Sequence, residues 1–495
     1  MGSLEGILTG FQVAFSLEGV LFVLIGVFVG TFIGMLPGLG PISAIAVMIP
    51  ITFGMDPAPA LVMMAGVYYG AIFGGSTSSI LLNAPGVSGA VATAFDGYPM
   101  AQQGKAGKAL AIAAICSFFG GTVSVLLLML LAPALSSVAI AFGPPAYFAL
   151  MLMGLTAISS LSEGSTIKAL LSAVAGFMVA TIGIDAQTGT QRFTFGNVNL
   201  LEGLDFLVIA LGLFALAEVC TLIINRKDLS QENTHKIGSM KLSKEDINEM
   251  KGPATRQSLL GFIIGVLPGA GATIASFIAY ISEKKIAKNP EEFGKGSVRG
   301  LAAPEAANNA ATSGAFVPLL SLGIPGSGTT AVMLGAFLVL GVQPGPLLMT
   351  DRPEIFWGVI ASMYIGNVFL LILNLPLIPY FAKILKIPRP LLISLVIMFS
   401  IIGVYAISFN TFDLYMLLLF GVVGFLMRIF SFPAPPFILA FILGGMMEQA
   451  FRQSLTISNG SLMIFVQDPI ALSLLIVSLL SFVFPLVRQL RKRKG

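Results

Sequence analysis

The sequence predicts an all-α polytopic membrane protein that is built from two inverted-topology repeats. Of its 495 residues, 56% are hydrophobic and only 10% are charged, and the mean hydropathy is +0.94. These values lie far outside the range of soluble globular proteins. Apolar runs of about 20 residues, the length that crosses the hydrocarbon core, recur along nearly the whole chain, so we expect roughly 10 to 12 transmembrane or re-entrant helices.

The second observation is a pair of repeated sequence words. LPGLG at Leu36–Gly40 returns as LPGAG at Leu267–Gly271, and NAPG at Asn83–Gly86 has a counterpart, GIPG, at Gly323–Gly326. The separations are 231 and 240 residues. Two Pro-Gly words at matched spacing inside apolar sequence indicate a chain with internal structural repeats, as in many membrane transporters.

The distribution of positive charge predicts that the repeats are inverted. No Lys or Arg precedes Lys105, whereas basic loops at Arg226–Arg256 and Lys284–Arg299 flank the LPGAG word. Both loops are cytoplasmic by the positive-inside rule, so the unit between them enters and leaves on one side. Its arms, Ser258–Leu267 and Ala272–Ile281, have ten residues each, about 15 Å of helix and half of the hydrocarbon thickness. We predict a re-entrant hairpin here and an oppositely oriented one around LPGLG.

These patterns also predict the domain boundaries. We expect a first membrane repeat at residues 1–224, a hydrophilic cytoplasmic linker at 225–257, a second membrane repeat at 258–487 and a basic cytoplasmic tail at 488–495. The formal charge of +4 comes from loops and this tail. It therefore reports membrane orientation and does not indicate nucleic-acid binding.

The sequence offers little for catalysis. Cys116 and Cys220 lie in separate apolar segments, and His235, the only histidine, lies in the polar linker. This pattern supports no disulfide framework, thiolate metal site or hydrolytic triad. We expect a protein that is not an enzyme and has no cofactor, with no metal beyond a possible Na⁺.

The Pro-Gly words have a physical use inside a bilayer. Proline removes a backbone donor and glycine tolerates positive φ, so one helix stops and another can begin within the membrane. The N–H groups of the new half-helix carry partial positive charge, and such backbone is tolerated at membrane depth only where it lines a cavity or is buried in protein. Four breaks, at Pro37-Gly38, Pro85-Gly86, Pro268-Gly269 and Pro325-Gly326, therefore predict a site for a small anion and one or more coupling cations.

The candidate binding residues are those of the breaks and the hydroxyl and amide side chains that cluster beside them. They are Pro37, Gly38, Gly40, Ser76, Thr77, Ser78, Ser79, Asn83, Gly86, Gly269, Gly271, Asn308, Asn309, Thr312, Ser313, Gly326, Ser327, Thr329 and Thr330. No Lys or Arg occurs within the four break units. An anionic substrate would therefore be held by backbone N–H groups, hydroxyls and bound cations.

Simpler interpretations of these residues remain open. Gly26, Gly30 and Gly34 have the spacing of a helix-packing stripe. Hydroxyl side chains in membrane helices often bond to the carbonyl four residues earlier, so only part of the candidate set is expected to touch a ligand. Glu305 is a candidate ligand for a coupling ion, because acidic residues near a membrane pathway commonly bind protons or cations. The alternative is a solvated residue at a helix start after Pro304.

Several long words resemble the large membrane subunit of the tripartite tricarboxylate transporter family. They are GTFIGMLPGLGP, YYGAIFGGSTSSILLNAPG, IDAQTGTQRFTFG, GFIIGVLPGAGA and APEAANNAATSGAFVPLLSLGIPGSGTTAVMLGAF, and they span nearly the whole chain. The resemblance assigns the family's glycine-proline loops to Pro37, Gly38, Gly40, Pro268, Gly269 and Gly271, and its polar stretches to Ser76–Ser79 and Asn308–Ser313.

The resemblance implies a secondary transporter of the bacterial inner membrane that imports small carboxylates, such as citrate or related di- and tricarboxylates, coupled to Na⁺ or H⁺. It also implies two partners, a small membrane subunit of about four helices and a periplasmic solute-binding protein that delivers the substrate. A moving domain that carries the hairpins would slide or rock against a scaffold. The alternative functions are a passive channel or exporter for small anions, which would need a continuous polar pore, and a structural scaffold for other subunits.

Overall fold

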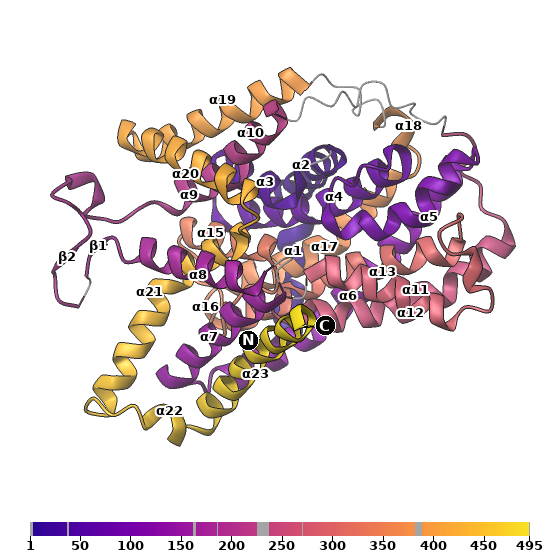
Figure 1. Cartoon of the computed structure of the whole chain (residues 1–495). Helices are drawn as coiled ribbons and strands as arrows, with labels where there is room; N and C mark the ends of the chain where they lie inside the picture. Colours follow the sequence, from indigo (N-terminus) through magenta and orange to yellow (C-terminus); the bar gives the residue numbers. More distant parts are fainter. Residues whose placement is uncertain are drawn as a thin grey trace.

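The computed structural model describes residues 3–36, 39–161, 165–185, 187–224, 237–269, 271–381 and 389–494. Helices make up most of these residues (Figure 1). The strands within them are β1 (Gly183–Ile184) and β2 (Gln191–Arg192), which form an antiparallel hairpin. The predicted all-α membrane class is therefore confirmed.

The helices contain the apolar runs that recur along the sequence. In chain order they are α1 (Ser3–Phe15), α2 (Leu17–Met35), α3 (Gly40–Met48), η1 (Ile49–Thr52), α4 (Pro57–Leu82), η2 (Ser88–Ala90), α5 (Val91–Gln102), α6 (Ala106–Ala139), α7 (Pro144–Leu161), α8 (Thr166–Ala180), η3 (Val198–Leu200), α9 (Phe206–Ala210), the π-helical turn η4 (Leu211–Leu216), α10 (Ala217–Ile224), α11 (Lys244–Val266), α12 (Gly271–Ile286), η6 (Pro290–Glu292), α13 (Val298–Gly314), α14 (Phe316–Leu322), α15 (Gly328–Val339), α16 (Leu348–Asp351), α17 (Pro353–Asn374), α18 (Ile378–Phe381), α19 (Arg389–Ser408), α20 (Thr411–Ile429), α21 (Ala434–Ile457), α22 (Ile464–Gln467) and α23 (Pro469–Lys494).

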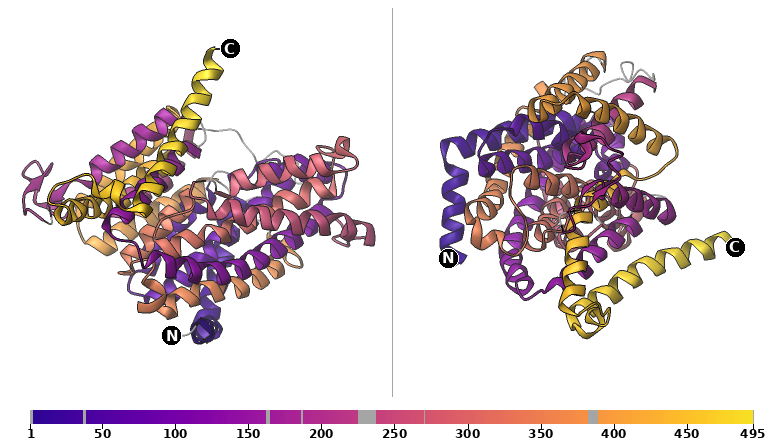
Figure 2. Two further views of the ribbon diagram at one scale, coloured as in Figure 1. Left: turned by 90° about the horizontal axis from the view of Figure 1, so that it is seen from below. Right: turned by 90° about the vertical axis from the view of Figure 1, so that its left-hand side faces the viewer.

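Seven helical segments in the described part of the chain are long and apolar enough to cross a membrane. They are α2, α4, α6, the continuous segment Phe206–Ile224, α17, α20 and α21. Shorter apolar helices, among them Gly40–Thr52 and Gly328–Val339, supply half-length segments that begin directly after a Pro-Gly break. The terminal helices lie at the edges: α1 packs along α17, and α23 ends outside the body of the molecule (Figure 2).

The two units that contain the LPG words have the same local packing. A methyl group on Gly34 of α2 would lie 2.1 Å from the carbonyl oxygen of Ala71 in α4. At the matched position, a methyl group on Gly265 of α11 would lie 2.3 Å from the carbonyl oxygen of Ala311 in α13. Backbone contact this close needs glycine, so the predicted packing stripe is real. The opposite membrane orientation of the two units stays a prediction.

The predicted arm lengths of the second hairpin are wrong. Its arms are α11, with 23 residues, and α12, with 16, instead of ten each. Helix α11 begins inside the predicted linker because Ser243 and Asp246 form a capping box, in which each side chain accepts a hydrogen bond from the other's backbone N–H. Asp246 also forms an ion pair of 2.5 Å with Lys108 of α6. Residues 244–257 are therefore helical, whereas His235 and the rest of 225–236 lie outside the described residues.

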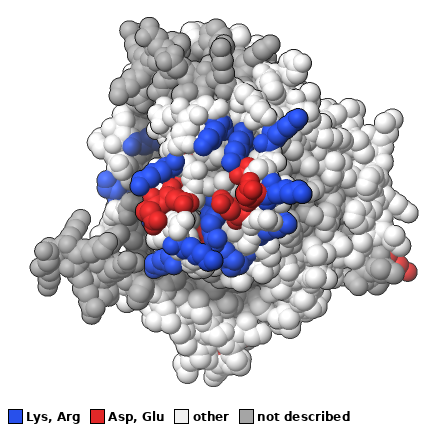
Figure 3. Space-filling model, turned by 90° about the vertical axis from the view of Figure 1, so that its right-hand side faces the viewer, with Lys and Arg blue, Asp and Glu red and all other residues white. Residues whose placement is uncertain are grey.

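Charged side chains gather in one patch on the end of the molecule that Figure 3 shows, and the rest of that view is almost free of charge. This end holds the α5–α6 loop, the start of α11 and the α12–α13 loop (Figure 1). Glu283 of α12, which is fully buried, joins α11 and α13 through Arg256 at 2.7 Å and Arg299 at 2.5 Å. The β1–β2 hairpin lies at the opposite end of the molecule (Figure 1). We call the first end the charged face.

Candidate functional site

Each of the four predicted breaks interrupts a helix. The interruptions lie between α2 and α3, between α4 and η2, between α11 and α12, and between α14 and α15. Positive φ angles carry the turns, at Asn83 (53°), Gly269 (84°) and Gly323 (71°). Residues other than glycine rarely adopt this conformation, which explains the glycines at 269 and 323. Pro37, Gly38 and Ala270 lie outside the described residues.

In each half of the chain, the first break contacts the second. The N–H of Gly269, at the α11–α12 tip, donates a 2.9 Å hydrogen bond to the carbonyl oxygen of Gly326. In the first repeat, Gly86 packs so closely on α2 that a methyl group there would lie 1.9 Å from the carbonyl oxygen of Gly34. Each pair of breaks is therefore one compact unit.

The two units then meet each other. Ser88 of η2 and Thr273 of α12 share a hydrogen bond of 2.7 Å between their hydroxyl oxygens. The hydroxyl of Tyr68, in α4, lies 3.3 Å from the hydroxyl oxygen of Ser327 at the start of α15. All four breaks are thus brought to one region, although the first and the fourth, at Pro37 and Pro325, are 288 residues apart in the chain.

A cavity of about 430 Å³ lies where the breaks meet, and we call it the central cavity. Its walls come from the starts of α3, η2, α12 and α15, from the middle of α4 and from the α20–α21 loop. The lining residues are Pro41, Ile42, Tyr68, Ile72, Val87, Ser88, Gly89, Gly269, Gly271, Ala272, Thr273, Ile274, Ser327, Gly328, Thr329, Ser431, Phe432, Pro433 and Pro435. Among these described residues none is charged.

Four predicted site residues line the central cavity directly: Gly269, Gly271, Ser327 and Thr329. Ser327 and Thr330 form a capping box at the start of α15, in which the Ser327 N–H donates to Thr330 Oγ1 at 2.8 Å. Thr330 therefore supports the cavity wall without lining it, and its hydroxyl is already hydrogen-bonded to Ser327. Gly40 and Gly86 do not line the central cavity but lie next to each other behind its wall, since a methyl group on Gly40 would lie 3.9 Å from the carbonyl oxygen of Gly86.

The polar stretch Asn308–Ser313 lies within the continuous helix α13, and its side chains are buried. Thr312 Oγ1 donates to the Asn308 carbonyl at 2.9 Å and Asn309 Nδ2 donates to the Glu305 carbonyl at 3.1 Å, so both bond to their own helix. Asn308 differs from them. It is fully buried, and neither its amide nitrogen nor its amide oxygen has a hydrogen-bond partner among the described residues. Ser313 is buried in the last turn of α13.

The side-chain oxygen of Asn308 faces Gly89, because a methyl group on Gly89 would lie 2.4 Å from it. Gly89 in turn lines the central cavity. The unpaired amide therefore stands directly behind the cavity wall.

The polar stretch of the first repeat is also helical, within α4, and does not reach the central cavity. Ser78 and Ser79 donate to the Gly75 carbonyl at 3.1 and 2.8 Å, as expected for hydroxyls in membrane helices. Thr77 is buried beside the Glu305 void described below. Asn83 is exposed and ends α4 in the left-handed conformation.

Glu305 forms a separate buried site. Its carboxylate accepts hydrogen bonds from Ser76 at 2.9 Å, from Ser117 at 2.6 Å and from Thr93, and it is fully buried. It lines a void of about 10 Å³. Glu305 lies in the middle of α13, so the alternative of a solvated helix start is wrong.

Sequence reasoning missed Tyr68, Ser88, Thr273 and the α20–α21 loop. Lys168 of α8 holds this loop: its ammonium donates to the Phe430 carbonyl at 2.6 Å and lies 5.3 Å from the ring centre of Phe432, a lining residue. The sequence word FPAPP, which begins at Phe432, could have predicted the α20–α21 loop, since its prolines interrupt apolar sequence.

Comparisons with known proteins identify the family. The family model described as "Tripartite tricarboxylate transporter TctA family" matches residues 20–439. An uncharacterized 52.8 kDa protein in the TAR-I ttuC' 3' region of Agrobacterium vitis is 45% identical over 499 residues, which covers 100% of this chain and 98% of that protein. An uncharacterized protein in the TAR-II ttuC' 3' region of the same organism is 45% identical over 235 residues, which covers 47% of this chain and 97% of the relative. No solved structure matches the chain. The chain belongs to the tripartite tricarboxylate transporter TctA family.

Proposed function

We propose that this transporter subunit carries small di- or tricarboxylates across the bacterial inner membrane by binding them in the central cavity. The observation that carries the proposal is the convergence of four helix breaks on one cavity of about 430 Å³ that no charged side chain lines. This volume lies within the usual range of small-molecule sites, about 300–1,000 Å³. Helix N-termini favour anions, and transporters with broken helices use them for substrate carboxylates.

The unpaired amide of Asn308 supports a ligand at this position. A buried polar group without a partner costs roughly 1–3 kcal/mol. A substrate or ion that reaches past Gly89 would offset this cost by bonding to the amide. The hydroxyls of Tyr68 and Ser327 lie 3.3 Å apart at the wall and would donate to the same carboxylate.

Glu305 is our candidate for the coupling ion. Salt bridges in the described residues do not include it, so the negative charge of a fully buried carboxylate would lack a basic partner. Such a group takes up a proton or a cation. The void of about 10 Å³ beside it is too small for a hydrated ion. The ion would therefore be H⁺ or a dehydrated Na⁺ held by the carboxylate and the hydroxyls of Ser76 and Ser117.

The charged face is proposed to be cytoplasmic, because it holds the basic loops. The same rule makes the basic C-terminal end of α23 cytoplasmic. The opposite end, with the β1–β2 hairpin, would face the periplasm and receive substrate from a solute-binding protein. A small membrane subunit of about four helices completes the proposed assembly.

The test is uptake by proteoliposomes that hold this chain and its small partner, with the binding protein outside and an imposed Na⁺ or H⁺ gradient. Radiolabelled citrate and smaller carboxylates serve as probes. Asn308→Ala and Ser327→Ala are expected to lower uptake, whereas Ser473→Ala, which removes an exposed hydroxyl of α23, is expected to leave it unchanged. Downhill equilibration that ignores both gradients would favour a passive channel instead.

A further inference from the structure

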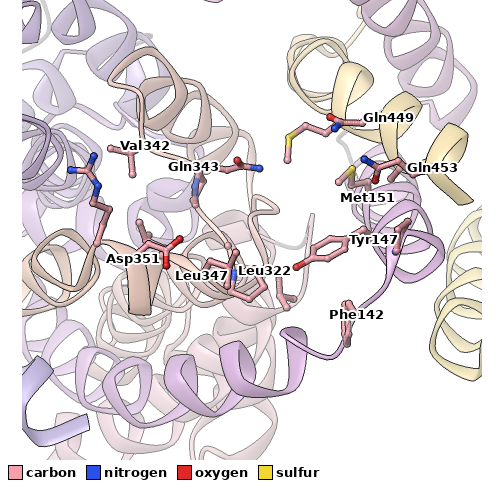
Figure 4. Close-up of a pocket in the computed structure, with 18 of the residues that line it drawn as sticks. Phe142, Tyr147, Met151, Leu322, Val342, Gln343, Leu347, Asp351, Gln449 and Gln453 are labelled. Carbon is pink, nitrogen blue, oxygen red and sulfur yellow. The ribbon is translucent and has the colours of Figure 1, made fainter. Parts of the chain in front are cut away.

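A second cavity, of about 510 Å³, lies outside the proposed binding site. Its two walls face each other across an opening (Figure 4). One wall comes from the segment between α14 and α17, and the other comes from α7 and α21. The polar side chains in this cavity are Gln343, Asp351 and Arg352 on the first wall and Tyr147, Gln449 and Gln453 on the second.

The chemistry of these side chains suits a carboxylate. Gln449 and Gln453 are four residues apart and so point from the same face of α21. Gln343, Gln449 and Gln453 are exposed residues. The Arg352 side chain is 57% exposed, and its carboxylate contact, Glu354, lies at 4.0 Å, so its donors are available. A guanidinium with neighbouring amides is a common arrangement for binding carboxylates.

The second cavity lies on the other side of the α14–α15 break from the central cavity. The loop that lines the second cavity packs on the break, because Gly345 N–H donates to the Leu320 carbonyl at 3.3 Å. Ser327, just past the break, lines the central cavity. Helix α21 runs past both: Pro435 lines the central cavity and Met446 the second. Eleven residues separate them, about 16 Å along the helix.

The second cavity is next to the end of the molecule that carries the β1–β2 hairpin. Glu448 and Arg452, on the same part of α21 as Gln449 and Gln453, hold this hairpin through Arg192 at 2.9 Å and Asp185 at 2.9 Å. This end is opposite the charged face (Figures 1 and 3).

We propose that the second cavity is an outer vestibule, a separate binding site in which a small di- or tricarboxylate is held before it passes the α14–α15 break. The inference rests on the proposed function for the direction of movement. Its chemistry complements that of the central cavity: Arg352 supplies the positive side chain that the central lining lacks. Asp351, beside it, would repel the anion.

This arrangement makes two substitutions act in opposite directions. Arg352→Gln removes a charged donor and is expected to raise the citrate concentration for half-maximal uptake about tenfold, while the maximal rate is kept. Asp351→Asn removes a repulsive charge and is expected to lower that concentration. Equal losses of maximal rate in both variants would mean that the loop is only structural, and would overturn the proposal.

A binding measurement separates this inference from the proposed function. Gln453→Cys, in a chain whose Cys220 is replaced by Ala while Cys116 stays buried, is labelled with a charged thiosulfonate. Millimolar citrate, malonate or succinate is expected to slow labelling, and to do so equally when Asn308→Ala is also present. Ser473→Cys, on exposed α23, is the control that no carboxylate should protect. Protection without any uptake would keep the vestibule and refute the transport proposal, whereas no protection by any of the three would refute the vestibule.

Discussion

Gly265→Ala is expected to push apart the helices that position the candidate site. The added methyl would lie 2.3 Å from the carbonyl oxygen of Ala311 and 2.6 Å from its Cα, whereas ordinary contact begins at 3.4 Å. Backbone cannot move aside as a flexible side chain can, so α11 and α13 must separate by about 1 Å, which forfeits up to half of the attraction along the contact. Overpacking of this kind costs about 1–3 kcal/mol.

The expected result is a fall of a few degrees in the melting temperature of the purified protein in detergent, measured at one heating rate. Gly34→Ala, at the matched position of α2, is expected to behave in the same way, since its methyl would lie 2.1 Å from the Ala71 carbonyl oxygen. Gly445→Ala is the control, because nothing lies within 4 Å of its added methyl and alanine favours the helix. If Gly265→Ala and Gly445→Ala have the same melting temperature, the close packing of α11 on α13 is wrong.

Three further predictions concern single side chains. Glu305→Gln keeps the size of the side chain and is expected to abolish the dependence of uptake on the Na⁺ or H⁺ gradient; an unchanged ion dependence would remove Glu305 from the coupling site. Tyr68→Phe removes the hydroxyl that lies 3.3 Å from Ser327. It is expected to raise the substrate concentration for half-maximal uptake about threefold to tenfold, whereas unchanged uptake kinetics would exclude contact between this hydroxyl and the substrate. Asp185→Asn is expected to speed tryptic cleavage at Arg192 at neutral pH, because it weakens the attachment of the β1–β2 hairpin to α21, and equal cleavage rates would contradict this. The Gln187 N–H and then Arg452 hold the pKa of Asp185 at about 2. In the unsubstituted protein the contribution of Asp185 to this attachment is therefore fully present above the ordinary carboxyl pKa of about 4 and is lost as the pH falls through about 2.

Helix positions and breaks were predictable from the sequence because they depend on local chemistry. Long apolar runs define α4 and α6, and Pro-Gly words interrupt helices wherever they occur. The glycine stripe at Gly30 and Gly34 was also readable as a packing surface, because small residues recur at helical spacing.

The composition of the cavity wall was not predictable to the same degree, because it depends on which segments meet. Tyr68 lies in an apolar run that reads as helix core, and only the meeting of α4 with α15 brings its hydroxyl to Ser327. The reverse error affected Ser78 and Ser79, which look like ligands but bond to their own helix. The length of α11 was missed because a capping box in polar sequence, and not hydropathy, sets its start.

The central claim is that four helix breaks form a carboxylate site, and equilibrium binding of radiolabelled citrate and smaller carboxylates to the purified chain tests it most directly. Unsubstituted protein and the Ser473→Ala control are expected to bind at least one of these anions equally. Asn308→Ala and Ser327→Ala should each weaken that binding about tenfold. The melting temperature should be kept in Asn308→Ala and should fall in Ser327→Ala, because that variant also loses the N-cap of α15. Equal affinity in all four proteins would contradict the account and leave the breaks as packing features.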